Sequence, residues 1–183
     1  MPLVFVQSGT ATAGLAEGLA DVAVLRRALD GDERFDTALV GTEARYAAVA
    51  TDNALARRRT VRISGLARYT VALDSRTGTT TASLWPAGSG PASTRETHGV
   101  DEWLTLIAAG QAVGVTSEAT ANQNPRPGVA YRAVRDAPRI PVWLAWWRDD
   151  RPYGLTELIA LARGAYQPAD QRPQTLGVDV AGH

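Results

Sequence analysis

The chain has 183 residues, 45% of them hydrophobic and 21% charged, a composition that is typical of a folded globular protein and excludes a largely disordered one. Its 19 basic and 19 acidic residues cancel, so no surplus of cations is available for nucleic acid or for an acidic membrane surface. There is no cysteine, which excludes disulfides and thiol chemistry and is compatible with a cytoplasmic location.

The N-terminal part of the chain predicts a strand, a short helix and a second strand. Leu3–Val6 is rich in β-branched and aromatic residues, Leu15 and Leu19 lie one helical turn apart, and Asp21–Leu25 is a second apolar run. This order predicts that the two strands pair in parallel. Further strands are expected at 38–40, 46–49, 69–73, 112–116, 129–134 and 140–147.

Two amphipathic helices are expected in the C-terminal half. Val100, Trp103 and Ile107 lie on one helical face, and Gly110 is expected to end that helix. A second helix is expected over Leu155–Ala162. Because strands and helices alternate along most of the chain, the fold class is predicted to be α/β with mostly parallel sheets. The tail, residues 167–183, is expected to be flexible. The longest apolar run is too short to span a membrane, and no signal peptide is expected.

Known catalytic motifs are missing from the sequence. It contains no phosphate-binding loop, no Gly-x-Ser-x-Gly elbow and no His-Glu-x-x-His pair. Only two histidines are present, one of them the terminal His183, so a histidine metal cluster is not expected and His98 is left as the one candidate imidazole base. No metal ion and no cofactor are expected. His98 could equally be a residue that starts a helix or lines a cleft.

Two hydroxyl-rich loops follow predicted strands and are candidate anion sites. Asp74–Thr81 contains Arg76, which could clamp a carboxylate or phosphate, and Ser8–Thr12 has a similar composition. The hydroxyl groups could instead merely cap helices and satisfy turns. Both loops lie at carboxyl ends of strands, which is where open α/β sheets bind ligands.

Two other features are ambiguous. Arg57–Arg59 is a run of three cations without interleaved aromatic residues, which favours a solvated surface over a nucleic-acid site. Trp143, Trp146 and Trp147 belong to a predicted buried strand, which favours core packing over a ligand pocket.

Several strings, in order, resemble the effector-binding domain of LysR-type transcriptional regulators. Gly18–Arg26 resembles the family motif in which leucine and aspartate precede an apolar run. Ala54–Ala56 resembles the family's His-Pro-Leu-Ala string, with departures at the first two positions. Val100–Val115 resembles the helix that leads to a Gly-x-Gly-Val strand, with Ala112 at a position where glycine is usual. Ala145–Arg148 resembles the family's apolar-Trp-Arg strand end.

The resemblance covers residues 3–166 and implies a fold similar to type 2 periplasmic binding proteins, with two α/β lobes and a ligand cleft between them. It implies that lobe one comprises 1–51 and 122–166 and that lobe two comprises 52–121. The hinge is expected near Thr51 and Asn122–Val129. The residues implied to bind the ligand are Ser8, Thr10, Thr51, Ser75, Arg76, Thr77, His98, Thr116 and Ser117.

Two departures from the family are expected to matter. The family's DNA-binding domain has no counterpart here, so this chain by itself is not expected to recognise an operator. The first strand and the first helix of lobe one also have no counterpart, which would leave a gap in a sheet unless a neighbouring chain or a rearranged segment fills it.

Three hypotheses remain open at this point. The leading one is an effector-binding domain that senses a small anionic metabolite by lobe closure, acting as a homo-oligomer (a dimer) or with a full-length regulator. The second is an isomerase or cyclase built on the same cleft, with His98, Asp101, Glu102 and Arg76 as candidate catalytic residues. The third is an interaction module in which a partner's strand completes the sheet.

Overall fold

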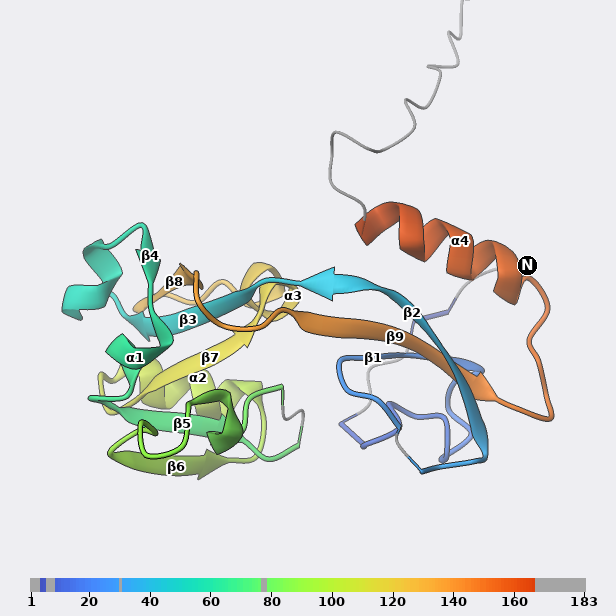
Figure 1. The fold of residues 1–183 in the computed structure, drawn as a ribbon, viewed down its shortest axis with the longest axis horizontal. Helices are drawn as coiled ribbons and strands as arrows, with labels where there is room; N and C mark the ends of the chain where they lie inside the picture. Colours follow the sequence, from blue (N-terminus) through green and yellow to red (C-terminus); the bar gives the residue numbers. More distant parts are fainter. Residues whose placement is uncertain (1–3, 6–8, 30, 77–78, 167–183) are drawn as a thin grey trace, which may run out of the picture.

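The computed structural model describes residues 4–5, 9–29, 31–76 and 79–166, which form two sheets at opposite ends of the molecule (Figure 1). The first sheet has the strand order β1-β9-β2 and the second has the order β4-β8-β3-β7-β5-β6. The strands are β1 (Val22–Leu25), β2 (Phe35–Glu43), β3 (Arg45–Ala50), β4 (Thr60–Val61), β5 (Thr70–Asp74), β6 (Ser93–Thr97), β7 (Val113–Ser117), β8 (Val129–Val134) and β9 (Ile140–Trp147). The helices are α1 (Ile63–Leu66), α2 (Val100–Ala108), α3 (Glu118–Gln123) and α4 (Leu155–Tyr166), with 3-10 turns η1 (Ala54–Arg57) and η2 (Ala82–Leu84).

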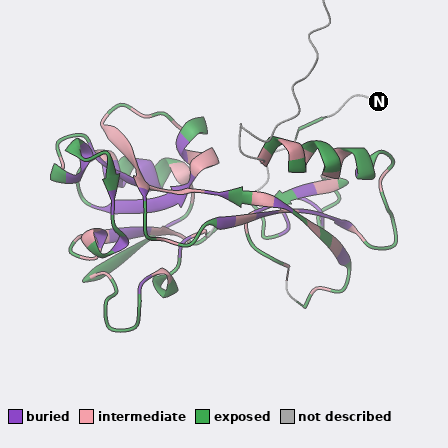
Figure 2. Cartoon of the chain, turned by 45° about the horizontal axis from the view of Figure 1, so that its top comes forward, coloured by how far each residue is buried: buried purple, intermediate pink, exposed green. Residues whose placement is uncertain are grey.

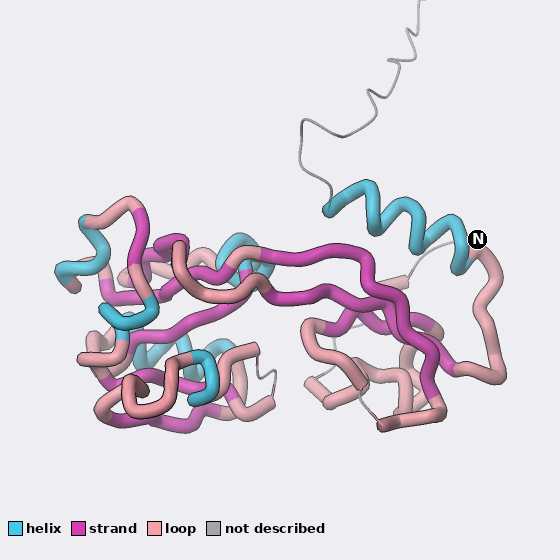
Figure 3. The backbone as a smooth tube through the Cα atoms, in the orientation of Figure 1, coloured by secondary structure: helices cyan, strands magenta, loops and turns pink. Residues whose placement is uncertain are grey.

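The chain passes between the two sheets twice, along two adjacent paths (Figure 3). We name residues 42–45, where β2 continues into β3, the first crossing, and residues 135–139, between β8 and β9, the second crossing. The resemblance placed the hinge near Thr51 and Asn122–Val129, but β3 and β8 are hydrogen-bonded into the second sheet. Residues 51–53 and Gly128 therefore lie at the ends of β3 and β8 remote from the crossings, whereas Asn122 and Gln123 belong to α3, whose start is hydrogen-bonded to the first crossing.

The expectation of mostly parallel sheets is wrong for the first sheet. β9 lies between β1 and β2 and pairs antiparallel with both. The second sheet is mixed: β3 is antiparallel to β7 and β8, whereas the pairs β4-β8, β5-β6 and β5-β7 are parallel. The order of elements along the chain could not show that a strand from its far end enters the first sheet in the opposite direction.

Of the predicted strand–helix–strand start, the second strand is confirmed by β1, but the first strand and the helix are wrong where the structure describes them. Val4 and Phe5 lie outside any strand and are exposed, and residues 1–3 and 6–8 lie outside the described part. Leu15 is fully buried, but it lies in a series of turns rather than a helix. Positive φ angles at Gly14 and Gly18 interrupt the right-handed helical conformation there.

Four clusters of buried side chains pack against the two faces of each sheet. The segments coloured as buried in Figure 2 include strands of both sheets. In the second sheet, α2 covers one face through Trp103, Leu104 and Ile107. In the first sheet, Leu15 packs against one face and α4 packs against the other. Alternation along β9 sends Ala145 to the first of these faces and Leu144 to the second.

The helix predictions over 100–107 and 155–162 are confirmed by α2 and α4. Core packing of the β9 tryptophans is confirmed as well: Trp146 is buried, and the Trp147 indole N–H donates to the Leu15 carbonyl. The flexible-tail prediction for 167–183 lies outside the described residues. Within the described part, none of the helices has the length and apolar character needed to cross a bilayer.

Candidate functional site

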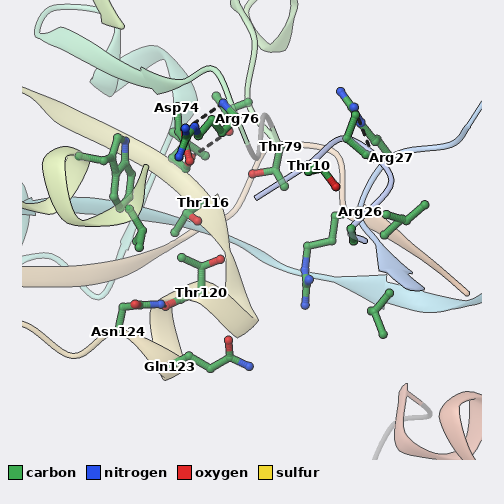
Figure 4. Close-up of a pocket in the computed structure, with 18 of the residues that line it drawn as sticks. Thr10, Arg26, Arg27, Asp74, Arg76, Thr79, Thr116, Thr120, Gln123 and Asn124 are labelled. Carbon is green, nitrogen blue, oxygen red and sulfur yellow. Dashed lines mark hydrogen bonds between the residues drawn. The ribbon is translucent and has the colours of Figure 1, made fainter. Parts of the chain in front are cut away.

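A cleft of about 270 Å³ lies between the two sheets. Residues 10–13 and the end of β1 supply one wall, and β5, α2, β7 and α3 supply the other. Thr10 and Arg26 enter from one side, while Thr116, Thr120 and Gln123 enter from the other (Figure 4). The cleft therefore contacts both lobes of the fold, so a bound molecule would join them.

Three of the residues predicted to bind ligand line this cleft: Thr10, Arg76 and Thr116. Thr10 also organises its own loop, because its hydroxyl donates to Glu17 and accepts the Gly14 backbone N–H. The Arg76 backbone N–H donates to the Asp74 carboxylate at 3.0 Å, which shapes the loop after β5. Thr10 and Arg76 come from the two hydroxyl-rich loops, and Thr116, which lies within β7, comes from the family resemblance.

Other predicted residues lie beside the cleft or far from it. Ser75 is exposed, and its hydroxyl donates to the Thr97 carbonyl. Ser117 is fully buried and caps α3 by accepting the Thr120 backbone N–H. Thr51 lies in the turn after β3, at the end remote from the crossings. Ser8 and Thr77 lie outside the described residues.

His98 and the acidic residues of α2 are directed to solvent rather than to the cleft. The His98 side chain is 70% exposed, and its backbone N–H donates to the Glu102 carboxylate, which helps to start α2. Asp101 is 95% exposed and faces Arg126 at 3.4 Å. Of the four candidate catalytic residues, only Arg76 lines the cleft.

Sequence reasoning missed several residues that line the cleft. Arg26 and Arg27 follow β1 directly, in the same way that Arg76 follows β5. The rule that ligands bind at carboxyl ends of strands, applied to β1, would have found both arginines. The other polar residues that were missed come from α3 and its end: Thr120, Gln123 and Asn124. Thr79 and Thr80 lie within the Asp74–Thr81 loop that the sequence predicts as a candidate site.

Glu43 holds Arg26 in place from beneath the cleft. The Arg26 guanidinium donates to both Glu43 carboxylate oxygens, at 3.1 and 2.8 Å, and only 4% of the Glu43 side chain is exposed. The Tyr166 hydroxyl and the Ala119 backbone N–H also donate to this carboxylate. Burial by itself would raise the pKa of Glu43, but the Arg26 charge and these hydrogen bonds outweigh it and lower that pKa.

The floor of the cleft is apolar and tightly packed. Trp103 lies against β7, where a Cβ atom at Gly114 would come within 2.1 Å of the indole Cζ2. Its indole N–H donates to the Ala72 carbonyl at 3.0 Å, so the ring has a fixed orientation. Val100 and Val115 complete this part of the lining. The lining therefore combines apolar side chains, Trp103 among them, with polar groups from both sides of the cleft.

The charges and donors of the cleft suit an organic anion. The lining contains three arginines, Arg26, Arg27 and Arg76, against one carboxylate, Asp74. Guanidinium groups form paired hydrogen bonds to carboxylates and phosphates. Within the described residues, no three His, Cys, Asp or Glu side chains come together as they would to hold a metal ion.

Comparison with known proteins places the fold in a family. A family model described as LysR substrate binding domain matches residues 3–167. Comparison with curated proteins gives no match. The structure is similar to the BenM effector binding domain with its effector benzoate, at 20% identity and a TM-score of 0.70, over 86% of this chain and 77% of that one.

Two further structures are similar in fold. The reduced OxyR regulatory domain from Pseudomonas aeruginosa has 17% identity and a TM-score of 0.63, with 82% of this chain and 75% of that chain covered. Full-length CbnR complexed with its target DNA has 18% identity and a TM-score of 0.67, with 85% of this chain covered. The chain spans 56% of full-length CbnR.

Proposed function

Because the chain belongs to the LysR substrate-binding domain family, we propose that it binds a small anionic effector in the cleft between its two sheets and closes around it. The observation that carries this proposal is the lining of the cleft, where arginines and hydroxyls from both sheets surround an apolar floor. The BenM domain of similar fold is described with benzoate, a small organic acid, as its effector. This supports a ligand of the same general kind.

The cleft favours an effector with one acidic group and an apolar body. Arg26 is already paired with Glu43, so Arg27 and Arg76 carry most of the uncompensated positive charge. A carboxylate bound to one of them would leave the rest of the ligand over Trp103 and Val100. The threonine hydroxyls and the Gln123 amide would then select the ligand's other polar groups.

The proposal of lobe closure rests on the fact that the two walls of the cleft belong to different sheets. One wall belongs to the first sheet and the other to the second, and the two crossings join them. A ligand that touches both walls binds the closed arrangement more tightly and shifts the population toward it. We propose the crossings as the boundary between the lobes, in place of Thr51 and Asn122–Val129.

We further propose that the chain works as the sensing part of a LysR-type regulator in the cytoplasm, as a homo-oligomer or together with a full-length regulator. The full-length CbnR structure, which has a similar fold over this part, contains its target DNA. We assign no direct DNA contact to this chain, because its acidic and basic residues balance. The family assignment favours binding over the isomerase or cyclase alternative.

The experiment that tests the effector proposal starts with native mass spectrometry of the purified protein, which would identify an acid that co-purifies with it. Calorimetry then compares that acid, and benzoate as a defined probe, with wild type and two variants. We expect Arg76→Ala to weaken binding about 10-fold or more, because it removes a charge-assisted contact. Arg95→Ala, an exposed arginine on β6, is the matched control. Equal affinity in Arg76→Ala and Arg95→Ala would overturn the site.

A further inference from the structure

Two arginines tie the crossings to each other in both directions. Arg45, in the first crossing, donates from Nε to the Pro138 carbonyl in the second crossing at 2.8 Å. Arg139, in the second crossing, donates from Nε to the Thr42 hydroxyl at 2.8 Å and from Nη2 to the Thr42 carbonyl at 3.1 Å. We name this reciprocal pair of arginines the arginine clasp.

The clasp binds neutral oxygen atoms. No ion pair of the described residues involves Arg45 or Arg139. Between the crossings, their acceptors are two backbone carbonyls and one hydroxyl, so the clasp depends on the direction of these hydrogen bonds rather than on attraction between opposite charges. Because the carbonyls are fixed parts of the crossings, these hydrogen bonds are kept only while the two crossings hold one relative position.

Arg45 also reaches the wall of the cleft. Its Nη1 donates to the Thr79 carbonyl at 2.6 Å and to the Thr80 hydroxyl at 3.4 Å. Thr79 and Thr80 both line the cleft, and the Thr80 hydroxyl donates onward to the Val115 carbonyl at 2.9 Å. A single guanidinium therefore contacts the second crossing with one nitrogen and the cleft wall with another.

We propose that the arginine clasp sets the resting separation of the two lobes and that Arg45 is a positioning residue, tying this separation to the cleft wall at Thr79 and Thr80. Rotation of the second sheet about the crossings moves Arg45, a β3 residue, relative to the Pro138 carbonyl, while the Arg139–Thr42 hydrogen bonds hold the two crossings together beside the Thr42–Pro141 pair of the first sheet. When the hydrogen bonds of the clasp break, neither the angle between the two lobes nor the position of the cleft wall at Thr79 and Thr80 is held any longer. The proposal concerns the protein without ligand, so its failure and that of the effector proposal are separate results.

The absence of cysteine from the sequence makes a direct distance measurement simple. Glu96→Cys on β6 and Glu157→Cys on α4 place one spin label on each lobe, and both positions are exposed. Double electron–electron resonance on this labelled protein gives the distribution of distances between the lobes. The same labelled pair is then measured with Arg45→Gln, Arg139→Gln and Arg135→Gln.

Arg135→Gln is the matched control. Arg135 lies in the second crossing and is exposed, and its contact with the second sheet runs through its backbone N–H, which bonds to Val61. We expect Arg45→Gln and Arg139→Gln to widen the distance distribution about two-fold, because domain motions otherwise held by the clasp become populated. Arg135→Gln is expected to keep the parent distribution. Distributions for Arg45→Gln and Arg139→Gln as narrow as that of the control would overturn the proposal.

Two further measurements separate positioning from general loosening. Hydrogen exchange of the backbone at residues 79–81 is expected to quicken in Arg45→Gln but not in Arg139→Gln, since only Arg45 contacts the cleft wall. Arg45→Lys keeps the charge without the planar fork and is expected to restore the distribution only partly. If Arg45→Lys restored the parent distance distribution in full, the proposal that the clasp depends on the direction of the guanidinium hydrogen bonds would be overturned. Arg139 is exposed, so if Arg45→Gln fails to fold, Arg139→Gln against Arg135→Gln decides the proposal.

Discussion

The side chain of Tyr166 lies directly on Gly41, so that a Cβ atom at position 41 would come within 2.2 Å of the Tyr166 Cβ. Gly41 follows an irregularity in the pairing of β2 with β9, just before Glu43. The Tyr166 hydroxyl donates to the buried Glu43 carboxylate at 2.9 Å. The end of α4 is thereby anchored to the first crossing through one ring and one carboxylate.

Gly41→Ala should destabilise the protein. The added methyl group would overlap the Tyr166 side chain and force the end of α4 away from β2, which we expect to lower the unfolding free energy by about 1–3 kcal/mol. Gly164→Ala is the control, because Gly164 lies in the same helix and has open space around it. That variant should be neutral or slightly stabilising. Urea unfolding of the two variants checks the prediction, and equal stabilities would contradict it.

The Tyr166 contact should make stability fall at high pH. Burial and the hydrogen bond to Glu43 raise the pKa of Tyr166 to about 12. Tyr166 therefore stabilises the folded state fully below its unfolded pKa, near 10, and this contribution is lost as the pH rises toward 12. We expect Tyr166→Phe to lose this part of the pH dependence when unfolding free energies are measured from pH 9 to 12. Tyr153→Phe, at a tyrosine that is 90% exposed, should keep it.

Glu43→Gln should be among the most damaging single changes at the crossings. It leaves Arg26 without its carboxylate partner, and breaking such a pair from one side should cost about 3 kcal/mol of unfolding free energy. Glu33→Gln, at an exposed carboxylate, should change it by less than about 0.5 kcal/mol. Chemical unfolding at neutral pH compares the two, and similar losses would contradict the role of the pair.

The Glu43 carboxylate should also make the unfolding free energy of the wild type fall at acid pH. The pKa of Glu43 is lowered in the folded protein from an ordinary value of 4.5, so its contribution is present above that pH and is lost as the pH falls through the folded value. We expect the unfolding free energy to fall below about pH 4.5, with a shallower fall in Glu43→Gln. If the unfolding free energies of the wild type and Glu43→Gln fell with the same slope between pH 5 and 3, Glu43 would not be the cause of the loss of stability in acid.

Many of the helices and strands could be predicted because each one has a characteristic spacing of apolar residues in its own stretch of sequence. The apolar spacing of Val100, Trp103 and Ile107 predicts α2 correctly, and the apolar run 140–147 predicts β9. Pairing direction leaves no such pattern. β9 lies between β1 and β2 although it is roughly a hundred residues away from them in the chain, and nothing in the local sequence of Val22–Leu25 indicates that neighbour.

The cleft could be predicted in part for a similar reason. Arg76 follows from the rule that loops after strands bind ligands and Thr116 follows from the family resemblance, whereas Gln123 and Asn124 reach the cleft only because Ser117 starts a short helix there. Glu43 could not be found from sequence at all. Its importance depends on Arg26, Ala119 and Tyr166 meeting in space around one buried carboxylate.

The position of β9 also governs when the first sheet can form during synthesis. β1 and β2 each pair with β9 and, within the described residues, with no other strand. Contacts of such long sequence separation carry a high loop-closure cost and form slowly. Within the described residues, β1 and β2 therefore gain their strand partner only after residues 140–147 have left the ribosome. The first sheet contains the strands that are synthesised first, yet it is completed last.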